Sequence, residues 1–404
     1  MKIALVIVTF DGTEKLRRHL GALISQSRKP DEIFIVNTGK RPVNLSGVVS
    51  GLPITVLDFD NIGPAGGFRR GGRAAYDSGS DYIIFADDDA VPCGSGTFAR
   101  LESHAKAGIA AVSGAYPDGV PITLANHYLM VSRLTIERLG LYFEPFFLMC
   151  EDMEYFERVR RGVGVLHDLS IRIDHPFRMP GDSFRTYLIV RNYFIHMALS
   201  GSARAFAAIF VCYFLRCLYL APREPGFFLA FARGVVDFAF GKTGRQAVPS
   251  KELAFGESGR PENGLLFGGG PELSGTPLEG LERWNTDIFG PVMDGREVSG
   301  PIRSFVDANM AAAGRDVVLA GDFFLAYPPF SLAARDIFAY EKGRFLHVRR
   351  NNPALSVLFT AAALPLSLIL LPPALLAFHF RRGELRRMLE RQVQEDSAHA
   401  GGYA

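Results

Sequence analysis

The first half of the chain alternates short apolar runs with amphipathic stretches. Four apolar runs have the length of strands, and polar residues follow each of them: 3–8, 32–36, 54–57 and 82–85. Between the first two runs, apolar residues from Leu16 to Ile24 recur at helical spacing. This order predicts an α/β fold in which helices flank a mostly parallel sheet.

Polar residues of chemical interest come directly after these predicted strands. They are found at residues 9–11, 37–39, 60–67 and 87–89. In open parallel sheets, ligands bind at the carboxyl ends of the strands. The four segments are therefore expected to share one rim of the sheet.

The character of the chain changes after residue 200. Residues 204–240 are rich in Phe, Leu and Ala but interrupted by charges, which predicts apolar or amphipathic helices within a region 201–245 that packs on the domain or on a membrane. Residues 241–301 are rich in Gly and Pro without periodicity and are interpreted as a linker or a loosely structured insert. The region 246–345 is assigned as a Gly/Pro-rich insert without a role.

The C-terminal region, residues 346–404, contains an uncharged stretch at 353–378 that is long enough to cross a bilayer. Arginines flank it on both sides, which conflicts with a single pass. Pro365, Pro372 and Pro373 are expected to bend a helix there. A re-entrant hairpin on the cytoplasmic side satisfies both observations; a full span and a soluble helix pair are the alternatives.

Composition narrows the class of protein. The 404 residues carry a net charge of +2 with both signs mixed along the first half, so no footprint for nucleic acid is present. The four cysteines form no C-x-x-C pair, which favours a reducing compartment over a zinc site or a disulfide framework. The first apolar run is too short for a signal peptide, so the catalytic half is expected to be cytoplasmic.

The strongest chemical signal is the run Asp87-Asp88-Asp89 at the end of an apolar strand. Adjacent carboxylates repel one another unless a cation neutralises them. Mg²⁺ and Mn²⁺ take oxygen ligands and commonly bridge to substrate phosphates. The run therefore indicates a metal-diphosphate site, and a solvated acidic turn is the alternative.

A Gly-rich segment, Asp60-Asn61-Ile62-Gly63-Pro64-Ala65-Gly66-Gly67-Phe68, is expected on the same rim. Its glycines would let the backbone approach a ligand. Its spacing matches neither the phosphate-binding loop nor the dinucleotide fingerprint. An ordinary turn at the start of a helix is the alternative.

Five motifs occur in an order that resembles glycosyltransferase family 2. They are Val6-Ile7-Val8-Thr9-Phe10, Ile35-Val36-Asn37-Thr38-Gly39, Asn61-x-Gly63-x-Ala65-Gly66-Gly67-Phe68, Ala86-Asp87-Asp88-Asp89 and Glu151-Asp152. The variant of the third motif looks most like bacterial galactofuranosyltransferases and rhamnosyltransferases. The resemblance covers residues 1–200 and implies a GT-A fold, a nucleotide-sugar donor and inversion at the anomeric carbon.

The resemblance also implies roles for single residues. Contacts to the nucleotide-sugar donor fall on Thr9, Phe10, Asp11, Asn37, Asp60, Asn61, Gly66, Gly67, Asp87 and Asp88. The metal ligands fall on Asp87, Asp89 and His175, with His167 as a competing histidine. Relatives usually carry an acidic residue where Asn37 stands. Arg191-Asn192 matches an Arg-Asn pair of relatives that contacts a phosphate or holds its helix to the domain.

Inversion needs a base that takes the proton of the acceptor hydroxyl. By resemblance Asp152 is this base, and Glu151 is its neighbour or an acceptor contact. The alternative is that both carboxylates only stabilise the N-terminus of a helix.

The sequence thus predicts an inverting glycosyltransferase that uses Mn²⁺ or Mg²⁺ with a UDP- or dTDP-sugar. Galactofuranose is the first expectation for the sugar and rhamnose the second. The apolar segments indicate a lipid-linked or glycan acceptor at the cytoplasmic face of the cell membrane. A nucleotidyltransferase and a non-catalytic scaffold of a glycan-assembly complex are the alternatives, whereas hydrolase motifs are absent from the sequence.

Overall fold

The computed structural model describes residues 1–45, 51–117, 119, 121–175, 182–220, 225–247, 250, 256–267, 277–284, 307, 310–320, 334–341, 344–350 and 353–401. Their contacts divide the chain into two units. The first unit, here called the catalytic unit, comprises Met1–Pro176, Thr243–Gln246 and Arg386–Ala404. The second comprises Phe177–Lys242 and Ala247–Leu385. The division falls at residue 176, whereas the sequence suggested residue 200.

The catalytic unit is built on one mixed sheet in the order β3-β2-β1-β4-β7-β6-β8-β5. Its strands are β1 (Ile3–Thr9), β2 (Glu32–Asn37), β3 (Ile54–Asp58), β4 (Tyr82–Asp87), β5 (Val91–Pro92), β6 (Ala111–Ala115), β7 (His127–Ser132) and β8 (Leu166–Asp174). The four predicted strands are β1 to β4, and they pair in parallel. Strand β7 pairs antiparallel with β4 and with β6. The predicted α/β fold is confirmed.

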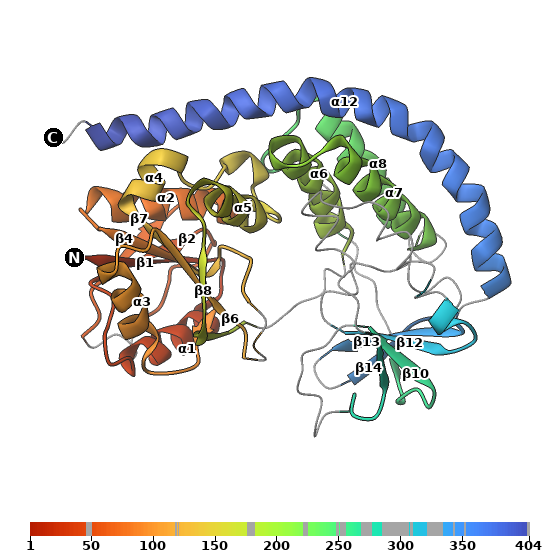
Figure 1. Cartoon of the computed structure of the whole chain (residues 1–404), viewed down its shortest axis with the longest axis horizontal. Coiled ribbons are helices and arrows are strands. Elements are labelled where there is room, and N and C mark those ends of the chain that lie inside the picture. Colours follow the sequence, from red (N-terminus) through yellow and green to blue (C-terminus); the bar gives the residue numbers. More distant parts are fainter. Residues whose placement is uncertain are drawn as a thin grey trace. The chain divides into compact units, whose positions relative to one another are not determined.

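Helices cover both faces of this sheet (Figure 1). They are α1 (Thr13–Ile24), α2 (Gly63–Asp77), α3 (Thr97–Lys106), α4 (Arg133–Leu139), a short 3₁₀ helix η1 (Glu144–Phe146) and α5 (Glu151–Val163). Because side chains alternate along a strand, Leu5 of β1 packs with α1 and α3, whereas Val6 packs with α2, α4 and α5. Two hydrophobic cores therefore fix the sheet from opposite sides.

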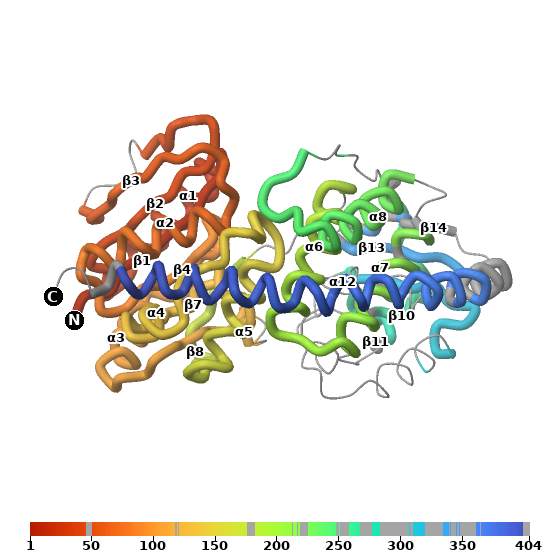
Figure 2. Tube along the Cα trace, turned by 90° about the horizontal axis from the view of Figure 1, so that it is seen from above, coloured from red at the N-terminus to blue at the C-terminus, as the bar shows by residue number. Residues whose placement is uncertain are grey.

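The last residues of the chain belong to the catalytic unit. Helix α12 (Pro353–Gly401) ends beside α2 and α4, as the tube view shows (Figure 2). Its buried Asp396 pairs with Arg69 at 3.1 Å and with Arg73 at 2.8 Å, and accepts a hydrogen bond from the backbone N–H of Leu141 at 3.0 Å. Gln392 donates to the carbonyl of Tyr142. This carboxylate has two cationic partners, so it is held firmly despite its burial.

The second unit contains three apolar helices and a small sheet. The helices are α6 (Ser183–Ser200), α7 (Ala203–Leu220) and α8 (Gly226–Ala239). The sheet has the order β11-β10-β12-β13-β14-β9, from β9 (Gly256–Ser258), β10 (Gly264–Phe267), β11 (Glu282–Trp284), β12 (Asp316–Ala320), β13 (Asp336–Glu341) and β14 (Arg344–Arg350). The expectation of a linker or loose insert at residues 241–301 is therefore wrong for β9, β10 and β11. Strands of three or four residues are too short to show a periodic pattern.

The predicted re-entrant hairpin at residues 353–378 is not formed. Helix α12 continues through Pro365, Pro372 and Pro373. Each proline removes one backbone hydrogen bond, but the intervening Leu and Ala residues are strong helix formers. Among the described residues, Ala361–Ala398 is the one helix long and apolar enough to cross a membrane, by length and composition only.

Candidate active site

The three consecutive acids at the end of β4 face different surroundings. Asp88 turns inward, where its Oδ2 accepts a hydrogen bond from the Thr9 hydroxyl at 2.7 Å. A Cβ at Gly12 would lie 2.0 Å from the same oxygen, so glycine is required there. Burial raises the pKa of Asp88 to about 6, although the hydrogen bond from Thr9 lowers it in part. Asp88 thus ties β4 to the end of β1 and is not one of the clustered metal ligands.

Asp89 lies between two basic side chains. Lys15 on α1 approaches its Oδ2 at 2.6 Å, and Nε2 of His175 lies 3.2 Å from its Oδ1. Burial opposes ionisation, but His175 and Lys15 together hold the pKa of Asp89 well below its usual range. Asp89 is therefore ionised and paired with Lys15 and His175. Lys15 was not predicted, since an exposed-looking lysine in an amphipathic helix carries no sequence signal.

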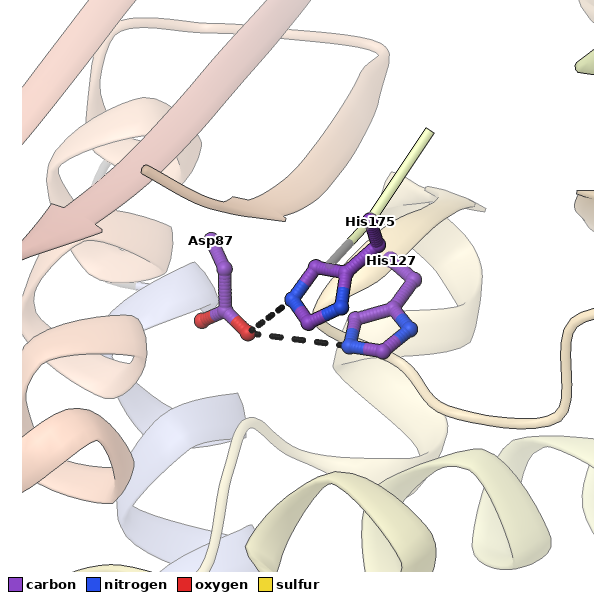
Figure 3. A group of neighbouring side chains, drawn as sticks. All are labelled: Asp87, His127 and His175. Atoms are coloured by element: carbon purple, nitrogen blue, oxygen red, sulfur yellow. Dashed lines mark ion pairs between the residues drawn. The ribbon is translucent and has the colours of Figure 1, made fainter. Parts of the chain in front are cut away.

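Asp87 faces two histidines (Figure 3). Its Oδ2 lies 3.6 Å from Nε2 of His175 and 3.7 Å from Nε2 of His127. The two imidazole rings stack with centroids 3.7 Å apart. One ligand atom from each of the three residues lies within 4.8 Å of the others. The structure thus brings the predicted Asp87, Asp89 and His175 together.

His127 was missed by the sequence reasoning. A β-bulge interrupts the pairing of β7 with β4 between Phe85 and Ala86, and Tyr128 adopts a left-handed φ of 72°. Bulges re-aim side chains next to active sites. Because of this bulge, the side chain of His127 does not follow the regular alternation of β7. The sequence contains no sign of such a bulge, so His127 could not be recognised there.

His127 is also held by its second ring nitrogen. Its Nδ1 lies 2.7 Å from the hydroxyl of Tyr116. Burial lowers the pKa of His127 well below its ordinary value, so the ring is neutral. A neutral imidazole whose other nitrogen is hydrogen-bonded has the form that binds metals.

The donor set fits a divalent transition-metal ion. It combines a carboxylate oxygen of Asp87 with imidazole nitrogens of His127 and His175, which lie within 4.8 Å of one another. Asp89 lies beside this group, with its Oδ1 3.2 Å from His175. Although burial opposes it, Asp87 and Asp89 raise the pKa of His175 to about 9. An ion bound here would take the place of a proton on His175.

Glu151 and Asp152 begin α5 after a strained turn. Phe147, Met149 and Cys150 all have positive φ values, between 65° and 72°. Such strain concentrates at functional sites because surrounding packing must maintain it. The turn fixes the point at which the two carboxylates enter the site.

The environments of these two carboxylates differ. Burial raises the pKa of Glu151 well above its ordinary value, and the charge of Asp152 adds to this effect. Burial raises the pKa of Asp152 only to about 6, because the backbone N–H of Met153 donates to it at 2.8 Å. Glu151 thus stays protonated, whereas Asp152 loses its proton near neutral pH. A general base must be deprotonated, so Asp152 has the state that a base requires.

Glu151 is positioned by a polar chain that the sequence did not reveal. Asn126 donates to its Oε1 at 3.4 Å, and Tyr142 donates to Asn126 at 3.0 Å. The carbonyl of Asn126 also accepts a hydrogen bond from the backbone of Asp87 at 2.7 Å. One segment, residues 126–127, therefore contacts both the acids of β4 and those of α5.

The residues predicted to contact the nucleotide lie on the same rim. Thr9, Asp11 and Asn37 line one small hollow together with Arg41. The amide of Asn37 donates to Asp58 at 2.8 Å, so a carboxylate from β3 lies beside the position where relatives carry an acid. Phe10 is exposed. Contact of these residues with a nucleotide stays a prediction.

The Gly-rich segment divides into two sets. Gly67 faces the sheet, where a Cβ would lie 2.8 Å from Val8, so packing alone explains this glycine. Asn61 and Gly66 line a separate cavity on the catalytic unit, and Asp60 is exposed. The structure therefore does not gather these four residues around one point.

Two further predicted residues lie elsewhere. His167 packs against Phe156, with ring centroids 5.9 Å apart, and is not in the histidine cluster around Asp87. Arg191 is fully buried in α6 of the second unit, where it donates to Asn192 and to the Tyr187 hydroxyl. These contacts agree with the role of holding its helix in place.

Comparison with known proteins identifies the domain. Residues 4–139 match the family "Glycosyl transferase family 2". The chain is 37% identical over 106 residues to galactofuranosyltransferase GlfT1 of Mycolicibacterium smegmatis, a match that covers 26% of this chain and 35% of that protein. It is 36% identical over 90 residues to GlfT1 of Mycobacterium tuberculosis, covering 21% and 29%. The matches thus span about a third of these relatives.

Two solved structures are also similar. The mannosyltransferase PcManGT from Pyrobaculum calidifontis, in complex with GDP-Man and Mn2+, shows 14% identity and a TM-score of 0.36, with 59% of this chain and 74% of that chain covered. S. aureus TarS 1–349, in complex with UDP-GlcNAc, shows 11% identity and a TM-score of 0.42, with 58% and 81% covered.

The family match and the fold agree with the resemblance stated from the sequence. The mixed sheet with helices on both faces carries acids at the end of β4 and at the start of α5, and the family match begins at β1 and ends with α4. Residues 4–139 of this chain match the model of glycosyltransferase family 2, and the sheet that contains them has a GT-A-like fold.

Proposed function

We propose that this protein is an inverting, metal-dependent glycosyltransferase that moves a sugar from a UDP- or dTDP-sugar to a glycan or lipid-linked acceptor. Galactofuranose is the favoured sugar and rhamnose the second candidate. The observation that carries the proposal is the convergence of Asp87, Asp89, His127 and His175 within a family 2 domain. The relatives named as galactofuranosyltransferases support the choice of sugar.

The cluster of four side chains is the part of the site that acts on the nucleotide-sugar donor. Asp87, Asp89, His127 and His175 would hold the ion, which when bound offsets the negative charge of the leaving diphosphate. Lys15 already lies against Asp89 and adds a positive charge at the same place. The hollow lined by Thr9, Asp11 and Asn37 is the proposed position of the nucleotide base.

Asp152 supplies the acceptor end. As the base, it takes the proton of the acceptor hydroxyl while that oxygen attacks the anomeric carbon from the face opposite the diphosphate. The buried, protonated Glu151 beside it leaves the negative charge on Asp152. The hydrogen bond from Met153 orients the carboxylate of Asp152 before the acceptor arrives.

Helix α12 supports action at the cytoplasmic face of the cell membrane. Its apolar part exposes Leu368, Ile369 and Phe380 to solvent. Exposed apolar side chains in a continuous helix favour contact with lipid. Arginines follow directly; Arg386 and Arg387 are exposed and would face anionic headgroups, whereas Arg381 is buried and pairs with Glu384.

The two alternative functions have less support. A nucleotidyltransferase is expected to carry a basic Gly-rich loop after the first strand, and the chain has Phe10-Asp11-Gly12 there. A non-catalytic scaffold would not need to keep an ionisable Asp152 beside a four-ligand cluster. The family match to transferases also favours catalysis.

The test uses the full-length chain in native membranes. UDP- and dTDP-sugars are supplied one at a time with Mn²⁺ or with chelator, and the released nucleotide is measured. UDP-galactofuranose with Mn²⁺ is expected to give the highest rate, and chelator to abolish it.

The matched control for this experiment is Asp152→Asn. It should bind UDP and Mn²⁺ as the wild type does but transfer no sugar. The proposal would be contradicted if wild type and Asp152→Asn released nucleotide at equal rates, or if the chelator left the rate of release unchanged.

A further inference from the structure

We propose that a cavity between the start of α2 and the turn after η1 binds a single neutral sugar ring of the acceptor. This inference rests on the proposed transferase function. The cavity lies within the catalytic unit and is lined by Asn61, Ile62, Gly66, Arg70, Glu144, Phe147, Gly244 and Arg245. None of these residues belongs to the metal cluster or to the hollow around Thr9 and Asn37.

The size of the cavity selects the class of ligand. Its volume is about 220 Å³. Pockets for drug-sized ligands have volumes of about 300–1,000 Å³. A nucleotide or a disaccharide therefore exceeds this space, whereas one monosaccharide ring suits it.

The walls of the cavity are fixed before any ligand arrives. The carbonyl of Phe147 accepts a hydrogen bond from Ala65 at 3.2 Å, and a Cβ on Gly63 would lie 2.2 Å from this oxygen. Asn61 Oδ1 accepts from the backbone of Gly63 at 3.2 Å. Because these groups already occupy N–H donors at the start of α2, the helix end itself is not the binding group.

The lining offers polar groups of both signs beside apolar surface. Glu144 supplies a carboxylate, whose Oε1 lies 3.3 Å from Arg69 and 3.8 Å from Nε of Arg70 and forms no hydrogen bond in the part of the chain described here. The amide nitrogen of Asn61 and the guanidinium of Arg70 supply donors. Ile62 and Phe147 supply apolar contact. Sugar hydroxyls both donate and accept hydrogen bonds, and ring C–H groups need apolar contact, so this mixture of donors, an acceptor and apolar side chains suits a sugar ring.

A distant segment completes the site. Residues Thr243–Gln246 return to the catalytic unit, although the residues on either side of them belong to the second unit. The backbone N–H of Gly244 donates to the carbonyl of Pro145 at 2.7 Å, and Gly244 has a φ of 68° that favours glycine. The turn sets Arg245 at the cavity, where its guanidinium forms no ion pair with any residue that the structure describes.

The position along the chain assigns the ring to the acceptor. Glu144 and Phe147 precede Asp152 by only a few residues, and the turn between them has positive φ values at Met149 and Cys150. The segment that holds the ring thus also carries the base that deprotonates the acceptor. Asn61 and Gly66 are accordingly assigned to the acceptor, whereas the family resemblance implied the donor.

The test measures binding without turnover. The full chain in detergent, saturated with UDP and Mn²⁺, is titrated with methyl β-galactofuranoside, methyl α-rhamnoside and methyl β-glucoside, and saturation-transfer NMR reports binding. At least one glycoside should bind. Glu144→Gln and Arg245→Ala should each weaken it about tenfold, the effect of one hydrogen bond to a charged group. Arg100→Ala, an exposed arginine on α3, should bind the glycoside as the wild type does.

Separate readouts distinguish the failures. UDP and Mn²⁺ affinity and the unfolding temperature should be unchanged in all three variants. If no glycoside binds, if inorganic pyrophosphate displaces the glycoside, or if the variants lose affinity for a UDP-sugar relative to UDP, the acceptor site is refuted. If a glycoside binds through Glu144 and Arg245 but UDP and Mn²⁺ do not bind, the sugar site stands and the proposed donor chemistry fails.

Discussion

Asp87, Asp88 and Asp89 are consecutive, yet each carboxylate has a different set of partners. Asp88 accepts a hydrogen bond from Thr9, Asp89 contacts Lys15, and Asp87 faces two histidines. Their chemistry is therefore set by neighbours from other elements, because a strand tip presents successive side chains in different directions.

His127 gives the first test at this scale. We expect His127→Ala to weaken Mn²⁺ binding at least tenfold in the presence of UDP, since one nitrogen ligand is lost. Tyr116→Phe should weaken it less, because it removes only the hydrogen bond to Nδ1. Titration calorimetry measures both. His104→Ala, whose histidine pairs with Asp168 instead, is the control, and unchanged Mn²⁺ affinity in His127→Ala would refute the assignment.

Asp152 gives a prediction about pH. Burial raises its pKa to about 6, and a base acts only when deprotonated. The rate of transfer at saturating metal should therefore be low at pH 5 and rise through about pH 6. Initial rates between pH 5 and 8 check this. A rate that is flat across this range would show that another group limits the reaction.

The sequence could predict the acids but not all their partners. Asp87, Asp89 and Asp152 follow strand or helix boundaries, so local pattern was sufficient to find them. His127 depends on a bulge at Tyr128, and Lys15 on the packing of α1 against the end of β4. Both are tertiary effects that one-dimensional spacing does not encode.

At the scale of elements, α2 shows why its sequence contains so many glycines. A Cβ on Gly71 would lie 2.4 Å from Val6 and 2.7 Å from Val36, so the helix packs directly on β1 and β2. Gly67 has the same function one turn earlier. The spacing of four residues between them is a signal of helix packing, whereas the sequence analysis considered only the glycines of residues 60–68 and interpreted them as a ligand-binding feature.

This packing predicts opposite effects for two similar substitutions. Gly71→Ala should lower the free energy of unfolding by about 1–3 kcal/mol, because the added methyl group clashes with the sheet. Gly21→Ala in α1 has open space and should raise it by roughly 0.5–1 kcal/mol. Chemical denaturation of both variants measures the difference, and a Gly71→Ala variant as stable as wild type would contradict the packing argument.

Other elements lay beyond sequence reasoning. The strands between Gly256 and Arg350 are short and scattered, so no period marked them. The prolines of α12 suggested a break, yet its apolar helix formers keep it continuous. In both cases contacts or propensity summed over many residues outweighed the local signal.

At the scale of the whole molecule, helix α12 predicts membrane association. Replacing the exposed Leu368, Ile369 and Leu376 together by Ser should weaken binding to vesicles that contain anionic lipid, by about tenfold or more for each side chain that enters the bilayer. Flotation with such vesicles measures it. Leu134→Ser, an exposed leucine on α4, is the control. Equal flotation of the triple variant and wild type would exclude this helix as the lipid contact.

Asp396 lies among the last residues of the sequence but satisfies Arg69, Arg73 and the turn at Leu141 near its beginning. A ribosome must therefore have passed residue 396 before the domain that contains Arg69 and Arg73 can acquire all of its buried ion pairs. Chains that terminate early would leave two arginines without their carboxylate, and cellular proteases would distinguish them from finished molecules.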